Sequence, residues 1–245
     1  MLIWEGLTKF RTNKHKSRRT IQAILTGHKS GSPSRNSKTG PVIQLHILDK
    51  ERNPVDAQST GDDSAVCGTC AHRHIEAQKK NANEADGHCY VETARAELST
   101  WRAHYGNEVE PFNAVDALSR SGLRLGAYGD PAMLPEKVIR RLCAVANKFR
   151  QNHTGFTQRW RLKSNQWLRF FCMASVRSAD EAQQAHDLGW RTFRIRSKAE
   201  PIEPGEITCP ASKEAGRRTT CQRCVLCDGM RSESDSRKHI VIIRH

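Results

Sequence analysis

No apolar run in this sequence of 245 residues approaches the length of about 18 residues that a membrane-spanning helix requires. The first residues also lack the charged and then apolar pattern of a signal peptide. We therefore expect a cytoplasmic protein with no membrane partner. The sequence also lacks a phosphate-binding glycine loop, a G-x-S-x-G elbow and an H-E-x-x-H pair, so the common nucleotide-binding, hydrolase and metalloprotease classes have no support.

Acidic residues are scarce in the first part of the chain. Residues 1–40 contain nine lysines and arginines but a single acid, Glu5, and the whole chain carries a net charge of +14. Such an excess favours nucleic acid as a partner, and the alternative is a solvated tail that only aids solubility. A linker rich in Gly, Ser, Pro and Asn ends near residue 36. We therefore predict a flexible basic arm over residues 1–36 and a single domain over residues 37–245.

The apolar pattern predicts alternating strands and helices. Strands are predicted at residues 42–48, 123–128, 155–160, 170–176, 192–195 and 240–243. Helices are predicted at residues 92–104, 135–149 and 178–189. Alternation of this kind indicates right-handed crossovers, so we expect an α/β fold with a largely parallel six-strand sheet or a partial (β/α)6 barrel.

Nine cysteines in a reducing compartment indicate metal ligation more than disulfide bonds. The more specific set lies towards the C-terminus, where Cys221, Cys224 and Cys227 have the C-x2-C-x2-C spacing typical of iron–sulfur ligation. Cys209 precedes a proline, as the remote fourth ligand of such sites often does. Zinc is the alternative metal, although its thiol ligands usually come as two C-x2-C pairs. Because the intervening residues are polar, we expect the metal to supply folding free energy here.

A second set, Cys67, Cys70 and Cys89, lies in a segment with almost no hydrophobic periodicity. These residues could hold a cluster with one open iron, or a zinc ion completed by a histidine. The candidate histidines are His72, His74 and His88. Two further alternatives are a single site shared by both cysteine sets, and three free thiols in a loop. The other cysteines, Cys143 and Cys172, are predicted to be small core residues.

Several polar groups follow predicted strands. Parallel strands end at one edge of a sheet, so the loops after them should share that edge. We expect Gly129, Asp130 and Arg194 to lie there beside the cysteine sets and to bind a cofactor. Asp130 could also be a base or the cap of a turn, since Asp and Pro both favour turns.

The motifs of residues 36–245 resemble an uncharacterised family of phage and prophage proteins, which implies the cytoplasm of a host cell. The matching motifs are SKTG at 37–40, CGTCAHR at 67–73, CYV at 89–91, RLGAYGDP at 124–131, MASV at 173–176, GWRTFR at 189–194, and CPAS at 209–212 with the three cysteines that follow.

The chain also resembles the radical S-adenosylmethionine superfamily, which has a partial (β/α)6 barrel. The resemblance matches Cys67, Cys70 and Cys89 to that superfamily's cluster loop after the first strand. It matches Gly129 and Asp130 to the motif that touches the cofactor. The spacing here is C-x2-C-x18-C rather than C-x3-C-x2-C. The resemblance implies S-adenosylmethionine as a cofactor and an auxiliary cluster at the second cysteine set.

Two functions follow from these patterns. The first is a phage-derived metal-cluster protein with a radical-enzyme-like barrel that acts on nucleic acid or nucleotides. The alternative is a non-enzymatic zinc protein that binds nucleic acid. The sequence names no protein partner.

Overall fold

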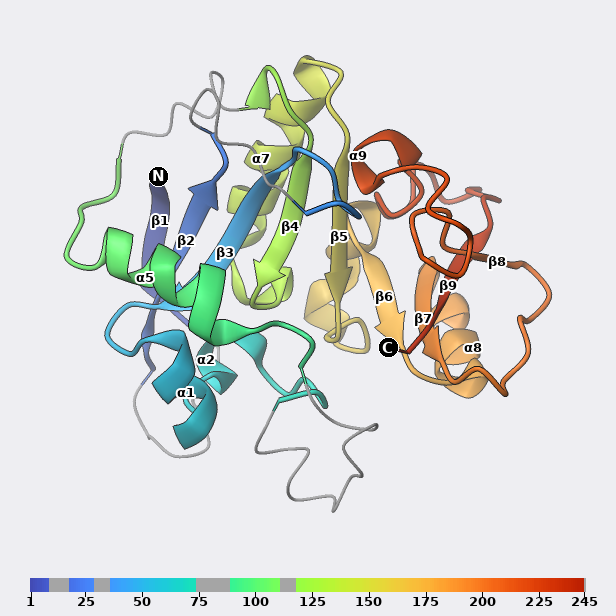
Figure 1. The fold of residues 1–245 in the computed structure, drawn as a ribbon, viewed down its shortest axis with the longest axis horizontal. Helices are drawn as coiled ribbons and strands as arrows, with labels where there is room; N and C mark the ends of the chain where they lie inside the picture. The colour runs from blue at the N-terminus through green and yellow to red at the C-terminus, as the bar shows by residue number, and fades with distance from the viewer. Residues whose placement is uncertain (9–17, 29–35, 74–88, 111–117, 245) are drawn as a thin grey trace.

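The computed structural model describes residues 1–8, 18–28, 36–73, 89–110 and 118–244 (Figure 1). Nine strands form one sheet in the order β1-β2-β3-β4-β5-β6-β7-β9-β8. The strands are β1 Leu2–Leu7, β2 Thr20–Thr26, β3 Ile43–Asp49, β4 Leu123–Tyr128, β5 His153–Thr157, β6 Met173–Val176, β7 Thr192–Arg196, β8 Glu206–Thr208 and β9 His239–Ile243. Strands β1, β2 and β3 pair in antiparallel fashion, and every later pair is parallel.

The predicted α/β fold with a largely parallel sheet is confirmed, but the six-strand count is wrong. All six predicted strands are present, and as β3, β4, β5, β6, β7 and β9 they are consecutive parallel neighbours. Strands β1, β2 and β8 extend the sheet at its two edges. In the described part of the chain the sheet does not close into a barrel, because β1 and β8 remain as separate edges.

Strands β1 and β2 lie in the segment for which the sequence predicted a flexible arm. Most side chains of β2 are fully buried, among them Ile21, Ile24 and Leu25. An ion pair between Arg19 and Asp49 fixes β2 against the end of β3. Apolar burial and a buried ion pair therefore build these residues into the sheet. Most of the basic run that suggested an arm falls on residues 9–17, outside the described residues.

Helices cover the two faces of the sheet unevenly (Figure 1). Helices α7 and α8 lie behind the sheet, which we call the back face, while α5 and the segment around α9 lie on the front face. Of the described helices, none is long and apolar enough to cross a membrane. The helical elements are α1 Pro54–Thr60, α2 Ser64–Cys67, the π-helix η1 Thr93–Glu97, α5 Leu98–His104, the 3-10 helices η2 Pro131–Met133 and η3 Lys163–Phe170, α7 Glu136–Lys148, α8 Ala179–Asp187 and α9 Cys221–Cys224.

The three predicted helical segments begin one residue after their predicted starts, at Thr93, Glu136 and Ala179. Pro135 caps α7, whose apolar stripe buries Ile139 and Leu142 against the back face. Ser178 caps α8 by accepting a hydrogen bond of 3.1 Å from the backbone N–H of Glu181. The Glu181 carboxylate accepts in return from the backbone N–H of Arg177, at 2.8 Å, and so closes a capping box one residue earlier than usual.

Gly129 fixes how closely the end of β4 approaches β3. Its φ is +79°, and a Cβ there would lie 2.7 Å from Cβ of Ile47 and 2.8 Å from the Ile47 carbonyl oxygen. Both values are shorter than contacts that real Cβ atoms make. Only glycine fits this position without moving the backbone.

We expect Gly129→Ala to lower the free energy of unfolding by about 2–4 kcal/mol, because it adds a backbone clash to the strain of a positive φ. Gly106→Ala is the matched control, since Gly106 has a φ of +77° and nothing within 4 Å of the added Cβ. The control should lose only about 1 kcal/mol. Urea unfolding of both variants measures the difference, and equal losses would show that the contact with Ile47 is not limiting.

Candidate metal centre

The first cysteine loop, residues 67–90, begins where α2 ends, beyond the last residue of β3. The backbone N–H of Asp130 donates a hydrogen bond of 2.8 Å to the carbonyl oxygen of Val66. The loop after β3 therefore meets the loop after β4 at the carboxyl edge of the sheet, as expected for parallel strands. Residues 74–88, which include His74 and His88, lie outside the described residues.

The three thiols of this loop lie close enough to influence one another. Burial raises the pKa of Cys67 well above its usual value, and negative charge on Cys70, Asp63 and Cys89 raises it further. Burial likewise raises the pKa of Cys70 to about 12. Burial is also the main reason that the pKa of Cys89 is raised. These thiols would therefore ionise only beside a strong positive charge such as a metal ion.

Buried arginines hold the loop in shape. Arg73 donates to the Asp63 carboxylate at 2.7 Å, to the Gly61 carbonyl at 2.6 Å and to the Gly68 carbonyl at 3.3 Å. Arg159 lies over Gly68, where an added Cβ would be 1.9 Å from one of its guanidinium nitrogens. The backbone of Gly68 has a φ of +59°, which favours glycine, and a side chain there would also displace the Arg159 guanidinium.

The carboxylate of Asp130 is engaged in hydrogen bonds within the protein. It accepts from the backbone N–H of Ala132 at 2.9 Å, from the Thr157 hydroxyl at 2.7 Å and from the backbone N–H of Gln158 at 2.8 Å. These bonds cap η2 and tie the end of β4 to the end of β5. Any contribution of Asp130 and Gly129 to cofactor binding would therefore come through the shape of this turn.

Arg194 is placed away from the other predicted site residues. Its side chain lies on the same face of β7 as that of Thr192, which reaches His186 of α8 on the back face. The guanidinium is 1% exposed and donates to both oxygens of the Glu206 carboxylate, at 2.7 and 2.6 Å. The side chain is thus committed to a buried ion pair, and cofactor binding by Arg194 would require that pair to open.

The second cysteine loop, residues 209–231, lies on the front face. Cys209 follows β8, Cys221 and Cys224 are the first and last residues of α9, and Cys227 is the third residue beyond that helix. All four line one small hollow, together with Thr154 of β5 and Ile240 of β9. Backbone hydrogen bonds from Cys221 to Lys38, at 2.9 Å, and from Gly155 to Cys227, at 3.1 Å, fix its walls.

One polar group in the hollow has no partner. The Thr154 hydroxyl is buried and makes no hydrogen bond with any residue that the structure describes. An unsatisfied buried hydroxyl is unfavourable, so it points to a hydrogen-bond acceptor in the hollow. Burial raises the pKa of Cys227 well above its usual value, while the nearby Arg191 guanidinium acts in the opposite direction.

Arg191 fastens the second loop to the sheet. The side chain is 2% exposed, and its guanidinium donates to the carbonyl oxygens of Leu226, Gly229 and Lys238, at 2.7, 3.0 and 2.7 Å. Two carbonyl groups of a loop with little apolar content, and a third just before β9, are thus satisfied by one side chain.

The two cysteine sets form separate sites, which differs from the expectation that one edge collects both loops. The second hollow lies over the first halves of β5 and β9, whereas the first loop lies beyond the ends of β3 and β4. The reason is that β8 is short and its last residue, Thr208, pairs with Val241 in the middle of β9. The chain therefore leaves β8 onto the front face rather than at the edge.

The metal-ligating geometry itself is not preformed. No group of three or more His, Cys, Asp or Glu side chains in the described ranges is already arranged to hold a metal ion. Cysteine has a single torsion between its backbone and its sulfur, so rotation of these thiols is the movement that a metal would require. Cys143 and Cys172 are both 0% exposed, which confirms them as core residues.

Sequence analysis missed three residues that shape these sites. Arg159 lay within an aromatic and arginine-rich run, and Arg191 within the GWRTFR motif, so their residue type and position were visible. Thr154 carried no signal, because its role depends on the register of β5 beside the second loop.

We expect Arg191→Lys to lower the free energy of unfolding by about 2–4 kcal/mol, because an ammonium group cannot satisfy three carbonyl groups arranged for a planar fork. Arg140→Lys is the matched control, because Arg140 is half-exposed, its ion pair with Glu136 lies on the surface of α7, and a lysine keeps the positive charge beside the Trp167 and Phe171 rings. Its loss should stay below about 0.5 kcal/mol. Urea unfolding followed by circular dichroism measures both, and a small loss for Arg191→Lys would contradict the fastening role.

Comparison with protein-family models, with curated proteins and with solved structures gave no match. The functional argument therefore rests on the two cysteine sites and on the arrangement of strands that positions them.

Proposed function

We propose that Cys209, Cys221, Cys224 and Cys227 hold a metal centre, an iron–sulfur cluster in the first place and zinc in the second. The observation that carries this proposal is that four cysteines line one hollow. One of them follows the end of β8, two lie in α9 and one follows α9. The unpartnered Thr154 hydroxyl in the same hollow supports it, because cluster sulfur atoms accept hydrogen bonds.

Cys67, Cys70 and Cys89 would hold the second metal centre of this proposal. A cubane cluster with three cysteine ligands leaves one iron open, and when S-adenosylmethionine binds there the pair supplies one-electron reductive chemistry. Cys67 packs against the core and would exclude water on that side, whereas Cys70 and Cys89 are half-buried. Asp130 would hold the turn beside the open iron through its three hydrogen bonds.

The order of the parallel strands is similar to that of a radical-enzyme barrel, although the described sheet is open. Six parallel strands, β3 to β7 and then β9, are neighbours in chain order. The first cysteine loop follows the first of them, and Gly129 and Asp130 follow the second. A partial (β/α)6 barrel has this order, so the argument is one of fold analogy. We infer a phage-derived enzyme, in the cytoplasm of a host cell, that acts on nucleic acid or nucleotides.

A non-enzymatic zinc protein that binds nucleic acid is the second candidate. The observation that favours it is His72, whose Nε2 is buried and has no hydrogen-bond partner among the described residues. Zinc readily combines imidazole with thiolate ligands, and His72 lies two residues from Cys70. In either case the basic run between Lys9 and Arg19 would add affinity for nucleic acid without specificity.

Metal identity separates the two functions. Protein purified without oxygen should be brown, with broad visible absorbance, and should contain iron and acid-labile sulfide if the first is right. Colourless protein with stoichiometric zinc and no iron would support the second function. Protein with neither metal, in a folded state, would contradict both.

We expect Cys224→Ser to abolish the metal centre of the second loop and to lower the thermal unfolding midpoint, because metal binding there contributes to folding. Iron, sulfide and zinc content per chain should fall by the content of one centre, and Cys67→Ser should remove the other centre independently. Cys143→Ala is the matched control, since it removes a cysteine from the core of the back face. Unchanged metal content in Cys224→Ser would sink the assignment.

We expect Thr154→Val to shift the reduction potential of the second centre to a more negative value, because a hydrogen bond to cluster sulfur favours the reduced state. Thr154→Ser keeps the hydroxyl and should leave the potential close to that of the unaltered protein. Redox titration monitored by visible absorbance measures both. If the two variants behave alike, the hydroxyl does not contact the cluster.

A further inference from the structure

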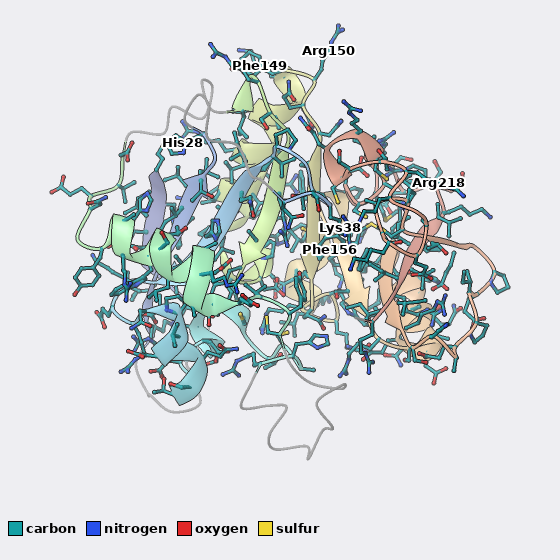
Figure 2. All side chains as sticks on the ribbon, viewed as in Figure 1. His28, Lys38, Phe149, Arg150, Phe156 and Arg218 are labelled. Atoms are coloured by element: carbon teal, nitrogen blue, oxygen red, sulfur yellow. The ribbon has the colours of Figure 1, made fainter. Side chains whose placement is uncertain are left out.

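The front face of the sheet is only partly covered between the two cysteine sites. Strand register places Gln44, Arg124 and Thr154 side by side on this face of β3, β4 and β5. Gln44 and Arg124 are half-buried, whereas Leu123 and Leu125, which point to the back face, are 0% exposed. Figure 2 shows Lys38 and Phe156 in front of the middle of the sheet. This half-open strip is bounded by the second loop and by the first cysteine loop.

Two cations of the strip have no counter-ion. The side chains of Lys38 and Arg124 are half-buried, and neither forms a hydrogen bond or an ion pair with any described residue. The positive charge of Arg124 acts on the Glu97 carboxyl and, together with that of Lys38, on the Cys221 thiol, but Arg124 makes no ion pair with either group. Elsewhere in the chain buried guanidinium groups are paired, as Arg73 is with Asp63 and Arg194 with Glu206.

Lys38 and Arg124 both lie beside the hollow of the second cysteine loop. Arg124 is the register neighbour of Thr154, which lines the cysteine hollow. The carbonyl oxygen of Lys38 accepts a hydrogen bond of 2.9 Å from the backbone N–H of Cys221. The backbone of Lys38 therefore contacts the loop that forms the wall of that hollow. Two partly desolvated positive charges without a partner favour an anionic ligand, and phosphate is the anion that arginine and lysine bind best.

An aromatic ring completes the strip. Phe156 lies two residues beyond Thr154 on the same face of β5 and is half-buried. Its ring contacts that of Phe193 at 4.6 Å between centroids, tilted by 57°. A half-exposed ring on a strand, close to unpaired cations, is the combination that holds a base by stacking and its phosphate by charge. The Gln158 side chain, which donates to the Ser175 hydroxyl at 2.8 Å, adds polar groups at the same end.

We propose that this strip binds a nucleotide unit, with its phosphate on Lys38 and Arg124 and its base against Phe156. The inference rests on the proposed function, because it names the substrate class of the face that lies between the two metal centres. It places the ligand at the centre of the sheet rather than on the basic run near the N-terminus. A free nucleotide and a single strand of nucleic acid share this chemistry, and the test below distinguishes them.

The experiment is a calorimetric titration of the protein, purified without oxygen, with adenosine monophosphate, adenosine and inorganic phosphate. The nucleotide should bind more tightly than either of its halves. Arg124→Gln and Lys38→Gln should each weaken nucleotide binding about tenfold, the effect of losing one charge-assisted hydrogen bond. Phe156→Leu should weaken nucleotide and adenosine binding but leave phosphate binding unchanged.

Lys137→Gln is the matched control, because it removes the same charge from the exposed side of α7, behind the sheet. It should leave nucleotide affinity unchanged. Equal weakening by Lys137→Gln and Arg124→Gln, or phosphate binding as tight as nucleotide binding with no effect of Phe156→Leu, would overturn the proposal. Circular dichroism shows whether Arg124→Gln keeps the fold of the unaltered protein. If it does not, Lys38→Gln tests the same phosphate contact, because Lys38 lies outside the strands of the sheet.

A single-stranded oligonucleotide distinguishes the two sources of the ligand. Tighter binding of the strand than of the monophosphate, lost in Arg124→Gln, assigns the strip to nucleic acid, and equal binding assigns it to free nucleotides. Metal content is measured on the same samples. Nucleotide binding by protein that contains no metal would refute the proposed metal centres and support nucleotide binding by the strip. Metal content without nucleotide binding would support the metal centres and refute nucleotide binding by the strip.

Discussion

Guanidinium groups that hydrogen-bond backbone carbonyls hold both cysteine loops in place. Arg73 binds the carbonyl of Gly68 in the first loop and that of Gly61 at the end of α1, and Arg191 binds those of Leu226, Gly229 and Lys238 around the second loop. Arg237 adds a further bond to Gly229. Loops with little apolar surface cannot be ordered by burial, so these charge-assisted bonds take over part of that role. The same positive charge lies near thiols that must become negative to bind a metal.

The sequence predicted the frame of the molecule more completely than its sites. All six predicted strands occur within a few residues of their predicted places, because branched apolar runs bounded by turn residues are local signals. Strands β1 and β2 were not predicted, because a strongly basic run and a polar linker flank them. The basic and polar composition of the segment indicated a flexible arm, and the apolar pattern of the two strands is short. Strand β8 is three residues long and leaves almost no pattern.

Of the candidate site, only the features that follow from the order and direction of the strands could be predicted from the sequence. The meeting of Cys67 and Asp130 at one edge followed from parallel strands ending together. The buried pair of Arg194 with Glu206 did not, because the face to which a strand residue points depends on register with its neighbours. The separation of the two cysteine sites was equally hidden, since it depends on where the short β8 stops along β9.

Strand β5 serves both sites within five residues. Thr154 and Gly155 meet the second cysteine loop, while Thr157 and the following Gln158 hold the carboxylate of Asp130 beside the first. Because successive residues of a strand point to opposite faces, deletion or insertion of one residue here would turn Thr154 and Thr157 each to the wrong side. Such a change would unseat both loops at once. The length of this short strand should therefore be the least tolerant of change in the course of evolution, although none of its residues is a candidate metal ligand.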